Sequence, residues 1–165
     1  MGIFDRKASR NAQPTDAMAS LQESIRDRGQ AQIPEAGGVV DSFASQILAR
    51  AGAVNNDRAR VWVIDRIRFF IVTVLSPQLL EFLKGLPEFP QLDAEYRVLV
   101  TNPDRFGAAH LVAWWWHLQP SLFKPFLQGQ FNQMEGALVD GTRSILANGG
   151  DFTSQLIDWN DFSRR

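Results

Sequence analysis

The stretch from Asp57 to Leu75, DRARVWVIDRIRFFIVTVL, constrains the fold more than any other part of the sequence. It begins with apolar residues at helical spacing and ends in FFIVTVL, in which Thr73 is the single polar side chain. Outside a membrane, such a run is covered only when other elements pack around it. It is also much shorter than the roughly 18 apolar residues of a membrane span. The sequence therefore predicts a central helix and no membrane span.

The other elements are predicted to be helices as well. Apolar residues from 39 to 48 share one helix face, Gly52 closes that helix, and Asn56 caps the central one. Ser76-Pro77 is expected to end the central helix, and a break is expected from Pro120 to Pro125. Further helical patterns cover residues 79–83, 92–100, 106–118, 125–148 and 152–162. We therefore predict an all-α fold, a single compact bundle of about six or seven helices with residues 57–75 and 125–148 side by side.

Residues 1–38 are predicted to form a flexible N-terminal extension of a helical domain that comprises residues 39–165. They hold few large apolar side chains and end in the breaker-rich IPEAGG, so they bury too little to order themselves. Within the extension, Met18, Leu21 and Ile25 lie on one helix face. This short amphipathic piece is expected to dock on a partner or on its own domain, or else to be a weakly helical linker.

The composition excludes several chemistries. The 165 residues carry a net charge of −1, which gives no overall attraction to nucleic acid or to an anionic membrane. Zero cysteines exclude disulfides, thiolate metal sites and a cysteine nucleophile. The N-terminus lacks the apolar core of a secretory signal, so we expect a cytoplasmic protein.

The two histidines do not form a recognisable reactive group. His110 and His117 lie seven residues apart, so about 10 Å of helix rise keeps them from binding one metal ion together. No nucleophile motif, phosphate loop, dinucleotide fingerprint or calcium loop accompanies them. The sequence thus predicts no catalytic residue, no metal site and no cofactor.

Three consecutive tryptophans, Trp114 to Trp116, are the most unusual motif. They cover about 200° of a helix, so we expect at least one of them to lie at the edge of the domain. Tryptophan is enriched in binding hot spots, which favours a protein-binding surface. The alternative is that a small helical core uses these rings as bulky filler. The predicted protein-binding residues are Trp114, Trp115, Trp116, Trp159, Met18, Leu21 and Ile25.

An excess of arginine on the central helix raises the hypothesis of nucleic-acid binding. At 100° per residue the four side chains spread over more than half of the helix circumference and form no stripe. Pairing with acidic residues of neighbouring helices, such as Glu81, Asp93 or Glu95, accounts for them better. The arginines concerned are Arg58, Arg60, Arg66 and Arg68.

From these observations we expect a non-enzymatic protein-interaction or assembly module: a subunit, adaptor or chaperone of a larger complex that uses the aromatic edge and the N-terminal arm. Its expected partner is another protein, and a homo-oligomer fits the same pattern. Two alternatives stay open. One is a nucleic-acid-binding protein that uses the arginine-rich helix, and the other is a small enzyme with His110 or His117 as its acid and base.

Overall fold

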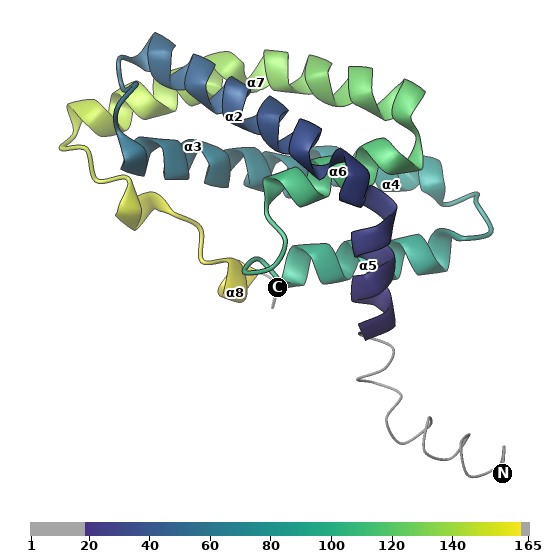
Figure 1. Cartoon of the computed structure of the whole chain (residues 1–165). Helices are drawn as coiled ribbons and strands as arrows, with labels where there is room; N and C mark the ends of the chain where they lie inside the picture. The colour runs from purple at the N-terminus through teal and green to yellow at the C-terminus, as the bar shows by residue number, and fades with distance from the viewer. Residues whose placement is uncertain (1–18, 163–165) are drawn as a thin grey trace, which may run out of the picture.

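The computed structural model describes residues 19–162, and every regular element among them is a helix (Figure 1). The predicted all-α class is confirmed. None of the helices in this range has the length and apolar character needed to cross a membrane. Residues 19–29 are helical. The elements that follow are η1 (Gln30–Gln32), α2 (Ile33–Ala51), α3 (Asp57–Phe70), η2 (Ile71–Leu75), α4 (Ser76–Leu83), α5 (Phe89–Thr101), α6 (Ala108–Leu118), α7 (Pro120–Ala147), η3 (Thr153–Gln155) and α8 (Trp159–Phe162).

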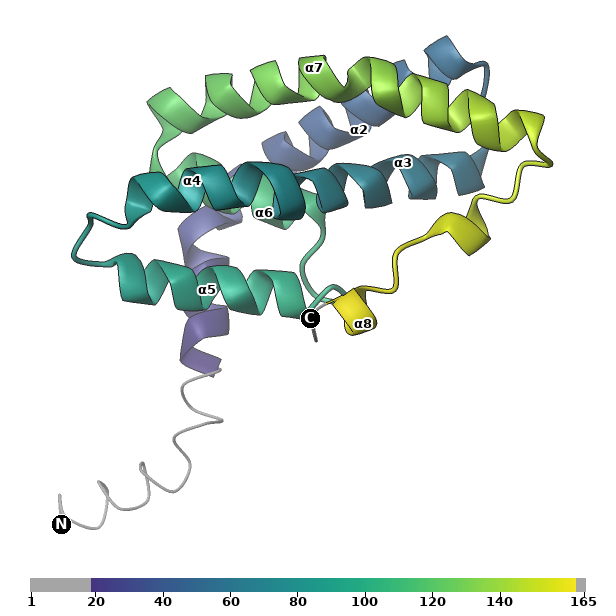
Figure 2. The ribbon, with the colours of Figure 1, turned by 180° about the vertical axis from the view of Figure 1, so that it is seen from behind.

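The helices pack around α6. Contacts join α2 to α3, α6 and α7, and α3 and α6 also contact α7. In both views α6 lies between α7 and α5, and the helical segment 19–29 crosses α5 (Figures 1 and 2). The predicted pairing of the central helix with residues 125–148 is confirmed by the contact of α3 with α7. At this contact a Cβ atom on Gly141 would lie 2.9 Å from the Trp62 ring, so a larger residue here would force the ring to shift.

The central helix begins as predicted but does not end at Ser76-Pro77. Ala59 N donates to the side chain of the capping Asn56 at 2.9 Å. The helix then passes through the π-helical η2 and continues as α4 (Figure 2). In η2 the Ser76 N–H reaches back five residues to the Ile71 carbonyl, and this wider turn accommodates Pro77, which lacks an N–H.

The predicted break from Pro120 to Pro125 is also absent, because α7 begins at Pro120 and runs through Pro125. A proline inside a helix removes one hydrogen bond. Phe123 and Leu127, on either side of it, are each only 1% exposed. Burial of these flanking side chains holds the helix together where the local signal predicts a stop.

The described part of the predicted extension belongs to the domain. The predicted boundary at residue 38 falls inside α2, whose Ala36 is fully buried. Ile25 in the helical segment 19–29 is only 4% exposed and joins the same core. The composition of this region predicts too little order, because a few buried side chains rather than a high apolar content hold it in place. Residues 1–18 lie outside the described range.

Burial along the central helix yields a direct test of this packing. Ile67 is fully buried, whereas Val61 on the same helix is 55% exposed. We expect Ile67→Asp to lower the free energy of unfolding by more than about 4 kcal/mol, because it buries an unpaired charge. Val61→Asp should change it by less than about 0.5 kcal/mol. Urea unfolding followed by circular dichroism measures both, and equal effects would contradict the placement of this helix.

Candidate functional site

The candidate site depends on how the N-terminal helical segment, residues 19–29, is held against the bundle. At Gly29 a Cβ atom would lie 3.2 Å from backbone atoms of α6. One residue earlier, Arg28 reaches Glu95 on α5, with Nε–Oε1 and Nη2–Oε2 distances of 2.7 and 2.8 Å. The absence of a side chain at Gly29 allows the segment to approach α6 closely, and Arg28 then forms a bidentate ion pair.

The Glu95 carboxylate joins three parts of the fold. Its side chain has no exposed surface. Besides Arg28, Trp114 Nε1 on α6 donates to Oε1 at 3.0 Å, and Gln91 Nε2 on α5 donates to Oε2 at 3.0 Å. Burial by itself would raise the pKa of Glu95, but these hydrogen bonds and the Arg28 charge hold the pKa below its ordinary value. The carboxylate is therefore ionised at neutral pH.

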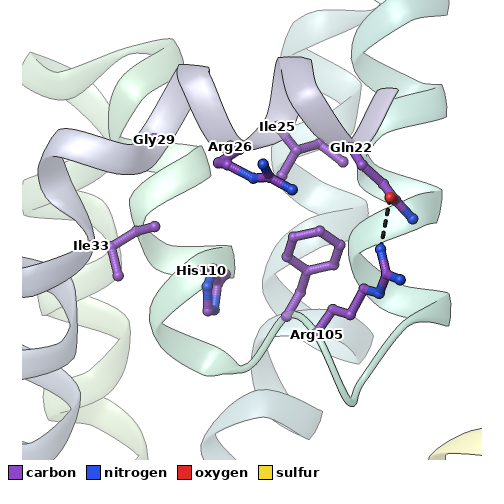
Figure 3. Close-up of a pocket in the computed structure, with 8 residues that line it drawn as sticks. Gln22, Ile25, Arg26, Gly29, Ile33, Arg105 and His110 are labelled. Carbon is purple, nitrogen blue, oxygen red and sulfur yellow. Dashed lines mark hydrogen bonds between the residues drawn. The ribbon is translucent and has the colours of Figure 1, made fainter. Parts of the chain in front are cut away.

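A pocket of about 320 Å³ opens where the N-terminal segment meets the α5–α6 connection and the first turn of α6 (Figure 3). Ile25 and Phe106 are buried, at 4% and 8% exposure, and give the pocket an apolar floor. This volume is at the small end of the range for ligand pockets, about 300 to 1,000 Å³. The lining residues are Gln22, Ile25, Arg26, Gly29, Ile33, Arg105, Phe106 and His110.

The guanidinium groups of Arg26 and Arg105 give the pocket a positive rim. Figure 3 shows Arg26 on the helical segment and Arg105 on the connection opposite. Arg105 Nη1 donates to Gln22 Oε1 at 2.8 Å, which holds this arginine at the rim. None of the described lining residues is acidic. The pocket therefore concentrates positive charge in a protein whose net charge is −1.

His110 contributes a neutral donor to the same pocket. The Gly107 N–H donates to Nδ1 at 3.2 Å, so the neutral ring carries its proton on Nε2. Burial lowers the pKa of His110, which keeps the ring neutral at pH 7. The Phe106 ring packs edge-on against it with the centroids 5.5 Å apart. His110 thus offers an N–H donor beside the guanidinium groups.

This combination suits a ligand that has both a negative group and a small apolar part. Guanidinium groups bind carboxylates and phosphates through paired hydrogen bonds, and the apolar floor favours a hydrocarbon group. Within residues 19–162, no group of three histidine, aspartate or glutamate side chains is placed to hold a metal ion.

The three consecutive tryptophans lie in the core, and the predicted aromatic edge is not formed by them. Trp114, Trp115 and Trp116 are 1%, 0% and 5% exposed. Residues 111–116 of α6 are all buried because α2, α3 and α7 pack against this helix, and Tyr96 of α5 contacts the rings of Trp114 and Trp115. The alternative prediction, that the three rings fill space in a small helical core, agrees with their burial.

The other predicted binding residues also make contacts within the chain. Trp159 is half-buried, its Nε1 donates to Asp65 Oδ1 at 2.7 Å, and the Arg68 guanidinium lies 4.2 Å above its ring. Ile25 and, partly, Leu21 pack on their own domain, so the docking predicted for this face takes place within the chain. Met18 lies outside the described residues.

Three of the four arginines on the central helix are engaged within the fold. Arg60 donates to a serine hydroxyl of α2, and Arg66 donates to the carbonyl of Gln155. Arg68 is 4% exposed and donates to two carbonyls near the end of α5. The acidic partners expected for them are paired elsewhere. These three acids form the ion pairs Lys84–Glu81, Arg97–Asp93 and Arg28–Glu95.

Among residues 19–162, the exposed apolar side chains do not define a second site. Phe82 is the most exposed of the large ones, at 66%. The others in this class are spread over α7, the central helix and two connections, and single exposed apolar residues are ordinary on protein surfaces. They are Val54, Val61, Val74, Leu86 and Leu122.

Sequence reasoning missed the arginines of the pocket. Arg26 lies within the predicted N-terminal extension, and Arg105 lies in the connection between α5 and α6. No local pattern joins them, because Arg26 and Arg105 are 79 positions apart. His110 was considered as a metal ligand and, in the enzyme alternative, as an acid and base, but not as a hydrogen-bond donor to a ligand.

Comparisons of the chain with protein-family models, with curated proteins and with solved structures gave no match.

The Arg28–Glu95 ion pair can be tested by its effect on stability. Arg28→Met leaves a buried carboxylate with fewer donors, and we expect it to lower the free energy of unfolding at pH 7 by about 2 kcal/mol. The depressed pKa of Glu95 means that its contribution is present above the ordinary glutamate pKa of about 4.3 and is lost as the pH falls through the lower folded-state pKa. The difference between wild type and variant should therefore shrink below about pH 4.

Arg97 provides the matched control for this measurement. It pairs with Asp93 at 3.0 Å, but its side chain is 76% exposed. Arg97→Met should change the free energy of unfolding by less than about 0.5 kcal/mol. Urea unfolding at several pH values gives the comparison, and an Arg28→Met variant as stable as Arg97→Met at pH 7 would contradict the structural role of Glu95.

Proposed function

We propose that this protein is a non-enzymatic protein-interaction or assembly module that holds a partner by an acidic group bound in the pocket. The observation that carries the proposal is the lining itself: Arg26 and Arg105 meet a neutral His110 donor above an apolar floor, with no acidic residue among the described lining. The proposal includes a cytoplasmic location and a place in a multi-subunit complex.

The charges at the pocket favour an acidic partner on energetic grounds. A hydrogen bond to a charged group contributes about 1.5–3 kcal/mol, roughly twice a neutral one. Arg26 and Arg105 are exposed in the free protein. A partner can therefore bind them without first breaking a buried ion pair, which would cost free energy. The apolar floor adds a hydrophobic contribution to the binding free energy, and this contribution is not screened by salt.

The N-terminal arm was expected to contact the partner as a flexible segment, and we propose instead that its helical part contributes to the pocket. Its helical segment supplies Gln22, Ile25 and Arg26 to the pocket, so the arm forms one wall of the site. The three tryptophans of α6 have an indirect role: they are buried in the core, and the backbone of the same helix contacts the N-terminal segment at Gly29.

Charge reversal at the pocket tests the proposal. We expect the double variant Arg26→Glu and Arg105→Glu to lose at least tenfold in partner capture, because like charges then face the acidic group. The measurement is affinity capture from host lysate by immobilised protein, with the captured proteins identified by mass spectrometry. A partner retained undiminished by this variant would contradict the proposal.

The matched control reverses the same number of charges on the central helix, by Arg58→Glu and Arg60→Glu. Capture of the protein partner should survive this change. The control also tests the nucleic-acid alternative, because recovery of nucleic acid that falls steeply with salt and is lost in the control variant would establish that alternative instead.

A further inference from the structure

We infer that the group bound in the pocket is the free C-terminus of a partner polypeptide, with its carboxylate between Arg26 and Arg105 and its last side chain on the apolar floor. The inference rests on the proposed function, in which an acidic group of another protein enters this pocket. It goes further by naming which acidic group enters and what accompanies it.

The size of the pocket limits the occupant. Its volume of about 320 Å³ is near the lower limit for ligand pockets. A pocket of this size accommodates one or two amino-acid residues, whereas several turns of a helix need a larger cavity. The occupant is therefore a short piece of a partner chain rather than an extended surface.

The placement of charge beside hydrocarbon separates a C-terminus from an acidic side chain. In a C-terminal residue the carboxylate and the side chain branch from the same Cα atom, so one residue meets the arginines and the floor together. An internal aspartate or glutamate brings peptide groups on both sides of its Cα atom. Ile25 and Phe106, which form the floor, offer no side-chain hydrogen bond to such groups.

The donors of the pocket match the acceptors of a terminal carboxylate. Two oxygens with several lone pairs can take hydrogen bonds from both guanidinium groups and from His110 Nε2–H. Gln22 holds Arg105 from the side, which limits the freedom that this arginine loses on binding. Capture of a C-terminal carboxylate is a recurring mode of peptide recognition, in which backbone N–H groups commonly supply the donors. In this pocket guanidinium and imidazole groups supply them instead. A phosphate would meet the same donors but would leave the apolar floor uncovered.

Synthetic peptides test the inference with the full-length protein. The probes are fluorescein-labelled hexapeptides that end in leucine with a free carboxylate, in leucine amide, or in glycine with a free carboxylate. A fourth peptide is amidated and carries an internal glutamate. Binding is measured by fluorescence anisotropy at protein concentrations up to about 1 mM, which detects even weak recognition of a single residue.

We expect the leucine free acid to bind most tightly. Amidation should weaken it at least tenfold by removing the charge, and glycine should weaken it about tenfold by leaving the floor uncovered. Arg26→Met combined with Arg105→Met should abolish the preference for the free acid, whereas Arg58→Met should leave it unchanged. The affected arginines are exposed, so the variants are expected to keep the wild-type thermal midpoint, which serves as the folding control.

The outcomes separate this inference from the proposed function. Equal binding of the leucine acid and amide, together with arginine-dependent binding of the internal glutamate peptide, overturns the inference and leaves the proposed function standing. Absence of binding by all four peptides overturns the inference. If lysate capture is in addition independent of Arg26 and Arg105, the proposed function fails too.

Discussion

A buried carboxylate organises this protein. Glu95 has no exposed surface, and its oxygens accept hydrogen bonds from the N-terminal segment, from α5 and from α6. An ionised group at such a position is tolerated only when donors surround it, because burial without partners costs several kcal/mol. Any rearrangement that moved one of the three elements would leave a charge unsatisfied. The ion pair with Arg28 therefore specifies where the N-terminal segment lies.

The position of that segment decides whether the pocket exists. Gly29 brings the segment against the backbone of α6, and the tryptophans of α6 fill the core beneath it. From this placement Arg26 and Ile25 face the α5–α6 connection, which carries Arg105 and Phe106 (Figure 3). The same contacts thus account for the stability of the segment and for the charged rim that we propose as a binding site.

The sequence predicted what local signals specify. The Asn56 cap, the Gly52 end of α2 and the pairing of α3 with α7 follow from capping chemistry and apolar spacing. Individual side-chain pairs between distant segments were not predictable: Arg28 and Glu95 are 67 positions apart. Strong local signals were also overridden, since the π turn absorbs Pro77 and the surrounding helices bury all three tryptophans of α6. Like the Arg28–Glu95 pair, the two arginines of the pocket could not be linked from the sequence, because only the tertiary structure brings them together.

Native-state hydrogen exchange tests most directly the claim that residues 19–29 are held on the bundle by Glu95. We predict that amides in this segment are strongly protected in the wild-type protein. In a Glu95→Gln variant, protection should fall selectively in this segment while the buried part of α7 keeps its protection, because the bidentate ion pair is lost. Exchange of the wild-type segment at the rate of an unstructured peptide would contradict the account, and with it the pocket that depends on this segment.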